Sequence, residues 1–144
     1  MTKKVEIRQI NLAKKLEAWD SLRLDLLNCK EATIALLQEP YLKKGFKMPY
    51  IKGYQAVYDS ESKARPRAAI LIHDSLEYAT VPSLIGPDIV TILTGKIANV
   101  ISSVYMDGKF EGNICAPLQR VVDYAIHSNS RVIIGGDFNF NAHS

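Results

Sequence analysis

The sequence contains little cysteine and no long apolar run. Its two cysteines, Cys29 and Cys115, show neither metal-ligand spacing nor a Cys-x-x-Cys pair. We therefore expect an intracellular, reducing compartment, with a single long-range disulfide as the alternative. No apolar run approaches the roughly 18–20 residues that a membrane-spanning helix needs, and no apolar segment follows the basic N-terminal residues. These absences argue against a signal peptide and a membrane partner.

Extremes of charge and composition are also missing. The 144 residues include 18 Lys and Arg against 15 Asp and Glu, and 47% of them are hydrophobic. A chain with this many apolar residues and so moderate a charge is not intrinsically disordered. Its length and composition are typical of one globular domain, which we place over residues 1–144.

The positive charge is concentrated in one segment. Seven basic and two acidic residues lie between Pro40 and Arg67, which gives this segment a net charge of +5 and the rest of the chain −2. Aromatic residues alternate with the basic ones, as in surfaces that bind polyanions. A set of solvated loops with aromatic anchors is the alternative. If the segment binds DNA, the candidate contacts are Lys43, Lys44, Arg65 and Arg67.

The apolar pattern predicts a mixed α/β domain. Residues 5–12 alternate as in a strand, and apolar residues then recur at helical spacing from Leu12 to Leu27. The middle of the chain resembles an antiparallel meander, and a second helix begins near Pro117. The predicted strands are 5–12, 33–37, 53–58, 67–73, 76–81, 88–93, 97–105 and 131–134. This order favours sheets with helices packed outside them.

Polar residues recur where the predicted strands end. These residues are Asn11, Glu39, Tyr105, Asp137 and Asn139. Strand ends that meet at one edge of a sheet often form a site, and carboxylate and amide oxygens are ligands that Mg²⁺ prefers. Bound Mg²⁺ stabilises the charge of a phosphate under attack. Each residue also has a structural alternative: a helix cap, an exposed turn residue, a core tyrosine or a turn former.

Five short motifs occur in an order that resembles the endonuclease/exonuclease/phosphatase superfamily. They are Gln-Ile-Asn-Leu at 9–12, Leu-Gln-Glu-Pro at 37–40, Arg-Pro-Arg-Ala-Ala-Ile at 65–70, Ser-Val-Tyr at 103–105 and Gly-Gly-Asp-Phe-Asn at 135–139. They most resemble the apurinic-endonuclease-like domain of non-long-terminal-repeat (non-LTR) retrotransposons, as does Asn-Ala-His-Ser at 141–144. The resemblance implies a four-layer α/β sandwich, partial or complete, with two facing sheets and helices outside.

The resemblance also implies a reaction and roles for the five strand-end residues. The reaction is Mg²⁺-dependent hydrolysis of a DNA phosphodiester, with Mn²⁺ as a possible substitute, and it nicks target DNA in the nucleus to prime reverse transcription. Glu39 would bind the metal with support from Asn11, and Asp137 would orient or deprotonate the attacking water. Asn139 would hold the phosphate or the water, and Tyr105 would contact the scissile phosphate.

The sequence departs from the family pattern at its C-terminal side. A second half with a Ser-Asp-His-like motif is absent, so we expect a domain truncated at its C-terminus, and His143 is not assigned the role of the missing His. Two functions therefore stay open: an active endonuclease, or an inactive nucleic-acid-binding or oligomerising module with the same fold. A homodimer that completes the sandwich is a possible assembly. A phosphatase acting on a small phosphoester is a third interpretation.

Overall fold

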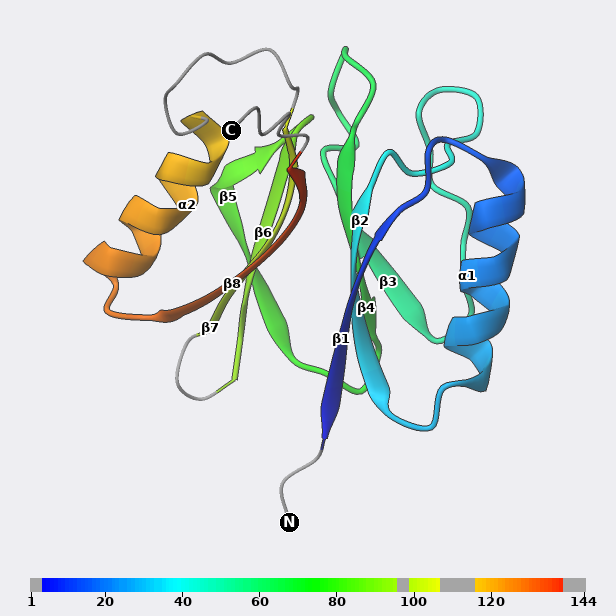
Figure 1. Cartoon of the computed structure of the whole chain (residues 1–144), viewed down its shortest axis with the longest axis horizontal. Coiled ribbons are helices and arrows are strands. Elements are labelled where there is room, and N and C mark those ends of the chain that lie inside the picture. The colour runs from blue at the N-terminus through cyan, green and yellow to red at the C-terminus, as the bar shows by residue number, and fades with distance from the viewer. Residues whose placement is uncertain (1–3, 96–98, 107–115, 139–144) are drawn as a thin grey trace, which may run out of the picture.

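The protein has four layers, helix, sheet, sheet and helix (Figure 1). The computed structural model describes residues 4–95, 99–106 and 116–138, with only the backbone of residues 137 and 138. Cys115, Asn139 and His143 therefore lie outside the described residues. The four layers confirm the predicted architecture, and the order of strands and helices follows the predicted order.

The first sheet begins with a parallel strand pair joined by a helix. Strands β1 (Val5–Asn11) and β2 (Ala32–Gln38) run in parallel, and α1 (Leu16–Asn28) connects them. The apolar stripe of α1 buries Trp19, Leu22 and Leu26 against the outer face of this sheet. The sheet is completed by β4 (Ala68–His73) and β3 (Tyr54–Val57), in the order β1-β2-β4-β3.

Helix α1 begins later than the predicted start at Leu12, so this part of the prediction is wrong. Ala13 and Lys14 adopt positive φ angles of 50° and 62°, which an α-helix does not contain. The backbone N–H of Leu12 donates to Gln38 O at 2.9 Å, and that of Lys14 donates to Glu39 O at 2.9 Å. These bonds turn the chain away from helical geometry and fasten it to the end of β2.

The second sheet contains the predicted meander. Strands β5 (Tyr78–Gly86), β6 (Ile89–Thr94) and β7 (Asn99–Met106) are antiparallel neighbours, and β8 (Arg131–Phe138) pairs in parallel with β7. Helix α2 (Ala116–His127) leads into β8 and covers the outer face. Strand β8 is longer than the predicted strand 131–134, because residues 135–138 continue the ladder with β7.

The inner faces of the two sheets form the central core of the molecule. Its buried residues include Ile34, Leu36 and Ile70 from the first sheet and Val90, Ile92 and Ile101 from the second. The sheets approach closely at Gly135. A Cβ atom at that position would lie 2.7 Å from Leu36 Cδ1 and 3.0 Å from Gln9 Cγ. The close packing of this layer therefore requires a residue without a side chain at position 135.

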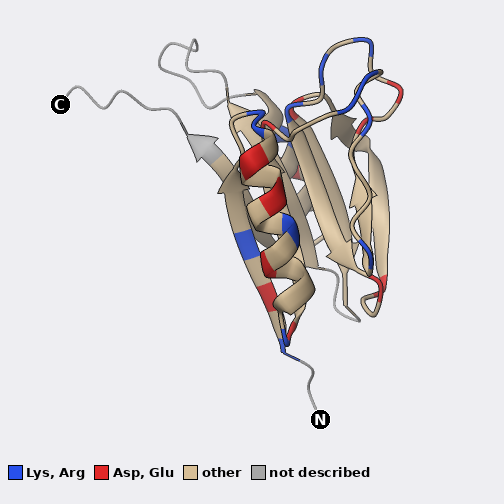
Figure 2. Ribbon diagram, turned by 90° about the vertical axis from the view of Figure 1, so that its right-hand side faces the viewer, with Lys and Arg blue, Asp and Glu red and all other residues tan. Residues whose placement is uncertain are grey.

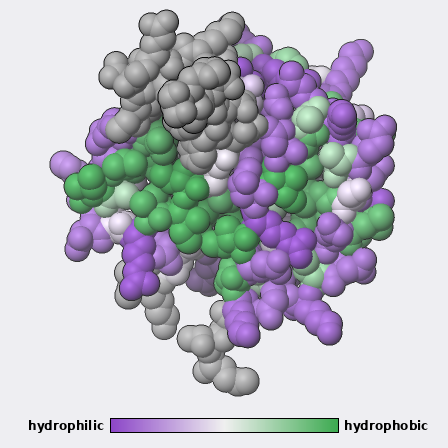
Figure 3. Space-filling model, viewed as in Figure 1, coloured by the Kyte–Doolittle hydropathy of each residue, from purple (hydrophilic) through white to green (hydrophobic). Residues whose placement is uncertain are grey.

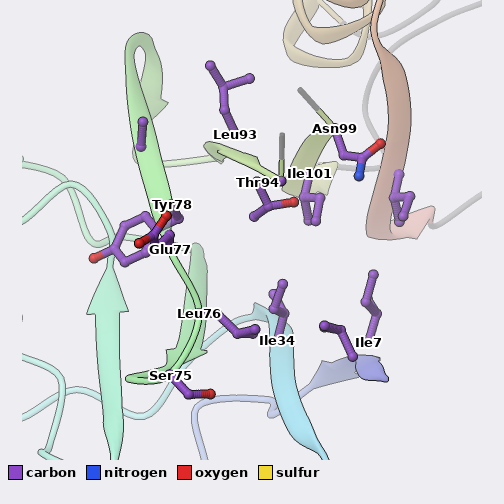
Figure 4. A pocket seen from close by; sticks show the side chains of 14 residues that line it. Ile7, Ile34, Ser75, Leu76, Glu77, Tyr78, Leu93, Thr94, Asn99 and Ile101 are labelled. Atoms are coloured by element: carbon purple, nitrogen blue, oxygen red, sulfur yellow. The ribbon is translucent and has the colours of Figure 1, made fainter. Parts of the chain in front are cut away.

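The outermost strands β1 and β8 lie beside each other and leave an apolar edge. Val5, Ile7, Val132 and Ile133 are exposed there, and Figure 3 shows apolar surface across this side of the molecule. A groove of about 810 Å³ opens between the sheets (Figure 4). Ile7, Ile34 and Ile101 line its wall, so the groove is continuous with the central core.

Two further features of the chain concern membrane spans and disulfide bonds. Among the described residues, no helix is long and apolar enough to cross a membrane. Cys29 is half-buried and has no disulfide partner among the described residues, and Cys115 lies outside them.

Candidate active site at one end of the two sheets

Asn11 and Glu39 lie side by side where β1 and β2 end. Asn11 pairs with Gln38 in the parallel ladder, and Glu39 is the next residue of the chain. The Asn11 side chain does not cap α1, because Lys15 occupies the N-cap position and Asn11 Oδ1 accepts the Ala13 N–H at 2.8 Å. The side chain of Asn11 therefore holds the turn that follows β1.

Glu39 has an unusual backbone conformation. Its φ angle is 48°, in the left-handed region that residues with a Cβ rarely adopt. Its N–H donates to Arg67 O at 2.9 Å, and its carbonyl accepts the Lys14 N–H. Bonds from both sides therefore stabilise a strained conformation, as is common at functional positions.

Tyr105 and Asp137 occupy the corresponding end of the second sheet. They are paired in the parallel ladder between β7 and β8. The N–H of Tyr105 donates to Asp88 O at 2.9 Å, so the start of β6 holds the end of β7. The side chain of Asp137 lies outside the described residues, and only its backbone position is known.

Arg67 connects the two strand pairs. It directly precedes β4, and Asp88 directly precedes β6 in the other sheet. The guanidinium donates twice to the Asp88 carboxylate, from Nε to Oδ1 at 2.7 Å and from Nη2 to Oδ2 at 2.6 Å. Its Cζ atom also lies 4.4 Å from the centre of the Tyr105 ring. Arg67 thus contacts Glu39 through its backbone and Tyr105 through its side chain.

A buried polar network links the sheets near the site. Gln9 Nε2 donates to Gln38 Oε1, and Gln38 Nε2 donates to Ser103 Oγ at 3.0 Å. The Ser103 hydroxyl in turn donates to Leu37 O at 2.7 Å. Gln38 and Ser103 are fully buried, and a buried polar group without a hydrogen-bond partner would destabilise the fold. These bonds therefore give each buried side chain a partner. The network fixes β2 relative to β7.

The candidate DNA-binding residues surround this end of the molecule. Figure 2 shows Lys and Arg in the loops beyond the strand ends. Lys43 and Lys44 are exposed in a small turn closed by backbone bonds between Lys43 and Lys47. Arg65 is half-buried, and its Nη2 donates to Pro40 O at 3.3 Å. Arg67 differs from the other three, because its guanidinium pairs with Asp88.

The residues at the strand ends suit a hard cation. Among the described side chains, no three His, Cys, Asp or Glu residues form a metal cluster. Mg²⁺ does not require such a cluster, since one or two carboxylates with water and phosphate oxygens complete its coordination. The half-buried Glu39 beside Asn11 provides one carboxylate. Metal binding at this place stays a prediction, as do the roles assigned to the five strand-end residues.

Sequence reasoning missed two features of the site. Asp88 was predicted only as the first residue of a strand, and no local signal marks it as the partner of Arg67. The Gln38–Ser103 bond was also missed. A signal existed there, because Gln38 directly follows an apolar run and Ser103 lies within a strand that is otherwise largely apolar.

Comparison with known proteins identifies the fold. No protein-family model and no curated protein sequence matches this chain. Among solved structures, it is similar to the endonuclease domain of TRAS1, a telomere-specific non-LTR retrotransposon, with a TM-score of 0.71 and 23% sequence identity. The similar region covers 93% of this chain and 58% of that chain. This chain therefore has the fold of that endonuclease domain, which confirms the predicted four-layer α/β sandwich.

Proposed function

We propose that this protein is a Mg²⁺-dependent DNA endonuclease that hydrolyses a phosphodiester bond. One observation carries the proposal: Arg67 joins Glu39, at the end of one sheet, to Tyr105, at the end of the other. This link between the strand end that bears Glu39 and the strand end that bears Tyr105 supports a shared site, in which the carboxylate would hold a cation and the phenol would contact a phosphate. The similarity to the TRAS1 endonuclease domain supports a nuclease-like role.

The chemistry follows from the types of residue at this place. Bound Mg²⁺ would neutralise the charge that develops on the phosphate during attack. Glu39 and Asn11 would hold the ion. The hydroxyl of Tyr105 would donate a hydrogen bond to a phosphate oxygen. Asp137 would accept a proton from the attacking water, as a general base does. Asn139 would orient the water or the phosphate.

The biological role is the finer part of the proposal. We propose that the chain nicks target DNA to prime reverse transcription, and that it acts in the nucleus, where that DNA lies. The similarity to a domain of a non-LTR retrotransposon supports this role. Mn²⁺ would replace Mg²⁺, because it also accepts carboxylate and water oxygens.

A plasmid-nicking assay tests the proposed activity. The purified chain, shown to be folded by circular dichroism and a thermal melt, is incubated with supercoiled plasmid. We expect nicked circles with Mg²⁺ or Mn²⁺ and none with EDTA. A folded chain that leaves the plasmid supercoiled with both ions would contradict the enzyme and leave the binding module as the function.

The inactive DNA-binding module is favoured by the exposed Lys43 and Lys44 near the site. Replacing both residues with Gln is expected to weaken DNA binding and to reduce the slope of log K against log salt by about 2, since each phosphate contact contributes about 0.9. Fluorescence anisotropy with a labelled duplex measures both quantities. The control replaces Lys4 and Lys30, which are also exposed but lie at the other end of the first sheet. An unchanged slope in the Lys43/Lys44 variant would exclude these two contacts.

We also propose that the open edge of β1 pairs with a second copy of the chain. The outer side of β1 has no neighbouring strand among the described residues, and such edges readily pair with another chain. Glu6 and Arg8 flank the exposed Ile7. Within the chain, Arg8 Nε already lies 2.8 Å from Glu6 Oε1. In an antiparallel pair centred on Ile7, Glu6 of each copy would also face Arg8 of the other, and the four charges would form one favourable cluster.

Substituting the centre of this edge tests the dimer. The Ile7→Lys variant is expected to stay monomeric at concentrations where the natural chain forms dimers, because two lysines would meet at the two-fold axis. Sedimentation equilibrium across a concentration series measures the association. Leu24→Lys is the control, since Leu24 is also an exposed apolar residue but lies on α1. A natural chain that is monomeric throughout the series would overturn the dimer.

A further inference from the structure

Among the four candidate DNA contacts, Arg67 is the one whose guanidinium is ion-paired with a carboxylate. Two hydrogen bonds, of 2.7 and 2.6 Å, join its guanidinium to the Asp88 carboxylate. Both side chains are about one-third exposed. A bidentate pair of this kind fixes the plane of the guanidinium and neutralises most of its charge. Such a cation attracts a distant phosphate less than an exposed, unpaired lysine does.

The same pair holds Tyr105 from two directions. The Asp88 carbonyl accepts the Tyr105 N–H at 2.9 Å, which fixes the backbone of the tyrosine. The Asp88 carboxylate fixes the Arg67 guanidinium, whose Cζ lies 4.4 Å from the centre of the Tyr105 ring. A cation over the face of an aromatic ring attracts it and restricts its position. Asp88 therefore acts on the backbone directly and on the ring through Arg67.

The backbone of Arg67 completes the arrangement. Its carbonyl accepts the N–H of Glu39 at 2.9 Å, and its own N–H donates to Pro87 O at 2.6 Å. Arg67 is therefore held by the segment that leads into β6, and it holds the residue that follows β2. A shift of its backbone would move Glu39, whereas loss of its side chain would release the Tyr105 ring and Asp88 and leave the Arg67 carbonyl in place for Glu39.

We propose that Arg67 is a positioning residue, which with Asp88 sets the place of the Tyr105 ring relative to the substrate phosphate and is not itself a DNA-binding cation. The proposal rests on the proposed endonuclease function for the role of Tyr105. The geometry of the Arg67, Asp88 and Tyr105 side chains does not depend on that function. The tests below therefore include one that requires no catalysis.

The first test observes Tyr105 directly. The chain is labelled with 3-fluorotyrosine, and the Tyr105 signal in the ¹⁹F NMR spectrum is assigned with the Tyr105→Phe variant. Arg67→Met is expected to shift the Tyr105 signal and to leave the other tyrosine signals in place. Arg67→Lys is expected to shift it as well, because an ammonium does not form the planar pair with Asp88. Arg23→Met, on α1, is the control for loss of an arginine.

A double variant tests the coupling to Asp88. If Asp88 acts on the ring through Arg67, then Asp88→Asn shifts the Tyr105 signal. In the Arg67→Met background, the same substitution changes it far less. A Tyr105 signal that is unchanged in Arg67→Met and in Arg67→Lys would overturn the proposal. So would equal effects of Asp88→Asn in both backgrounds.

The second test separates positioning from DNA binding. In Arg67→Met, the nicking rate at saturating DNA is expected to fall about 10- to 100-fold, since small displacements of a positioned group cost this much. The Kd for DNA and its salt dependence are expected to stay unchanged. A salt slope lower by about 0.9, with an unchanged saturated rate, would instead make Arg67 a phosphate contact and overturn the proposal. If the natural chain nicks no DNA, the endonuclease function fails, and the NMR result still decides whether Arg67 positions the ring.

Discussion

The Asp137→Asn variant is expected to lose nearly all nicking activity while it keeps its fold. Asparagine has the same size and can occupy the same place in β8, but it cannot accept a proton from water. Loss of a general base typically lowers the rate by about 10²- to 10⁴-fold. Asp137 is paired with Tyr105 in the ladder between β7 and β8, so the proposed base and the proposed phosphate contact belong to neighbouring strands. Initial rates on supercoiled plasmid at fixed Mg²⁺ measure the effect.

The control for Asp137→Asn is a second aspartate that lies away from the strand ends. Asp123 is exposed on α2 and accepts a hydrogen bond from Gln119, so Asp123→Asn removes one carboxylate without reaching the site. We expect it to nick at the natural rate. A thermal melt of both variants verifies folding. Full activity in a folded Asp137→Asn variant would exclude Asp137 as the base.

The second large effect is expected from Gly135, and it concerns stability. In Gly135→Ala the new Cβ would lie 2.7 Å from Leu36 Cδ1 and 3.0 Å from Gln9 Cγ and from Leu36 Cβ. Leu36 is fully buried in the core between the sheets, so it has little room to move. Overpacking of this kind costs about 1–3 kcal/mol in the free energy of unfolding. Gly135→Val should cost more, because it adds two further methyl groups. Chemical denaturation followed by circular dichroism measures the loss.

A matched glycine and a compensating substitution make this test specific. Gly86→Ala, at the end of β5, would place its Cβ 3.8 Å from Ile89 Cγ2, an ordinary contact, and should leave the free energy of unfolding nearly unchanged. Combining Gly135→Ala with Leu36→Val removes part of the obstacle. The pair should therefore lose less stability than the sum of the single variants. Additive losses would show that the two residues do not collide.

Periodicity predicted the elements well where local pattern determines them. The buried strand β2 and the antiparallel order of β5, β6 and β7 were predicted because apolar runs and turn residues are local signals. The end of β5 was wrong, because the strand extends to Gly86, beyond the predicted 76–81, through an irregularity in its pairing with β6. The start of α1 was wrong, because bonds to the distant end of β2 hold Ala13 and Lys14 in left-handed conformations. Such bonds form only in the folded chain, so the sequence of residues 12–16 does not predict them.

The positions of the candidate site residues were predicted where strand ends indicated them, but the long-range contacts between these residues were not. Strand ends indicated Asn11, Glu39, Tyr105 and Asp137, and the structure places all four backbones at one end of the sandwich. The partner of Arg67 could not be predicted, since Asp88 is brought to it only when the two sheets meet. Arg67 was therefore grouped with the exposed lysines by its charge alone.

The left-handed backbone of Glu39 lowers the stability of the fold at a position that is proposed to bind the metal ion. For a residue with a Cβ this conformation costs about 1–2 kcal/mol, a cost that glycine does not bear. A screen that rewards only heat resistance would therefore favour glycine at position 39. The more thermostable variants selected in this way would lack the carboxylate that is proposed to hold the cation. Selection for stability would therefore favour glycine at position 39, whereas selection for DNA cleavage would favour glutamate.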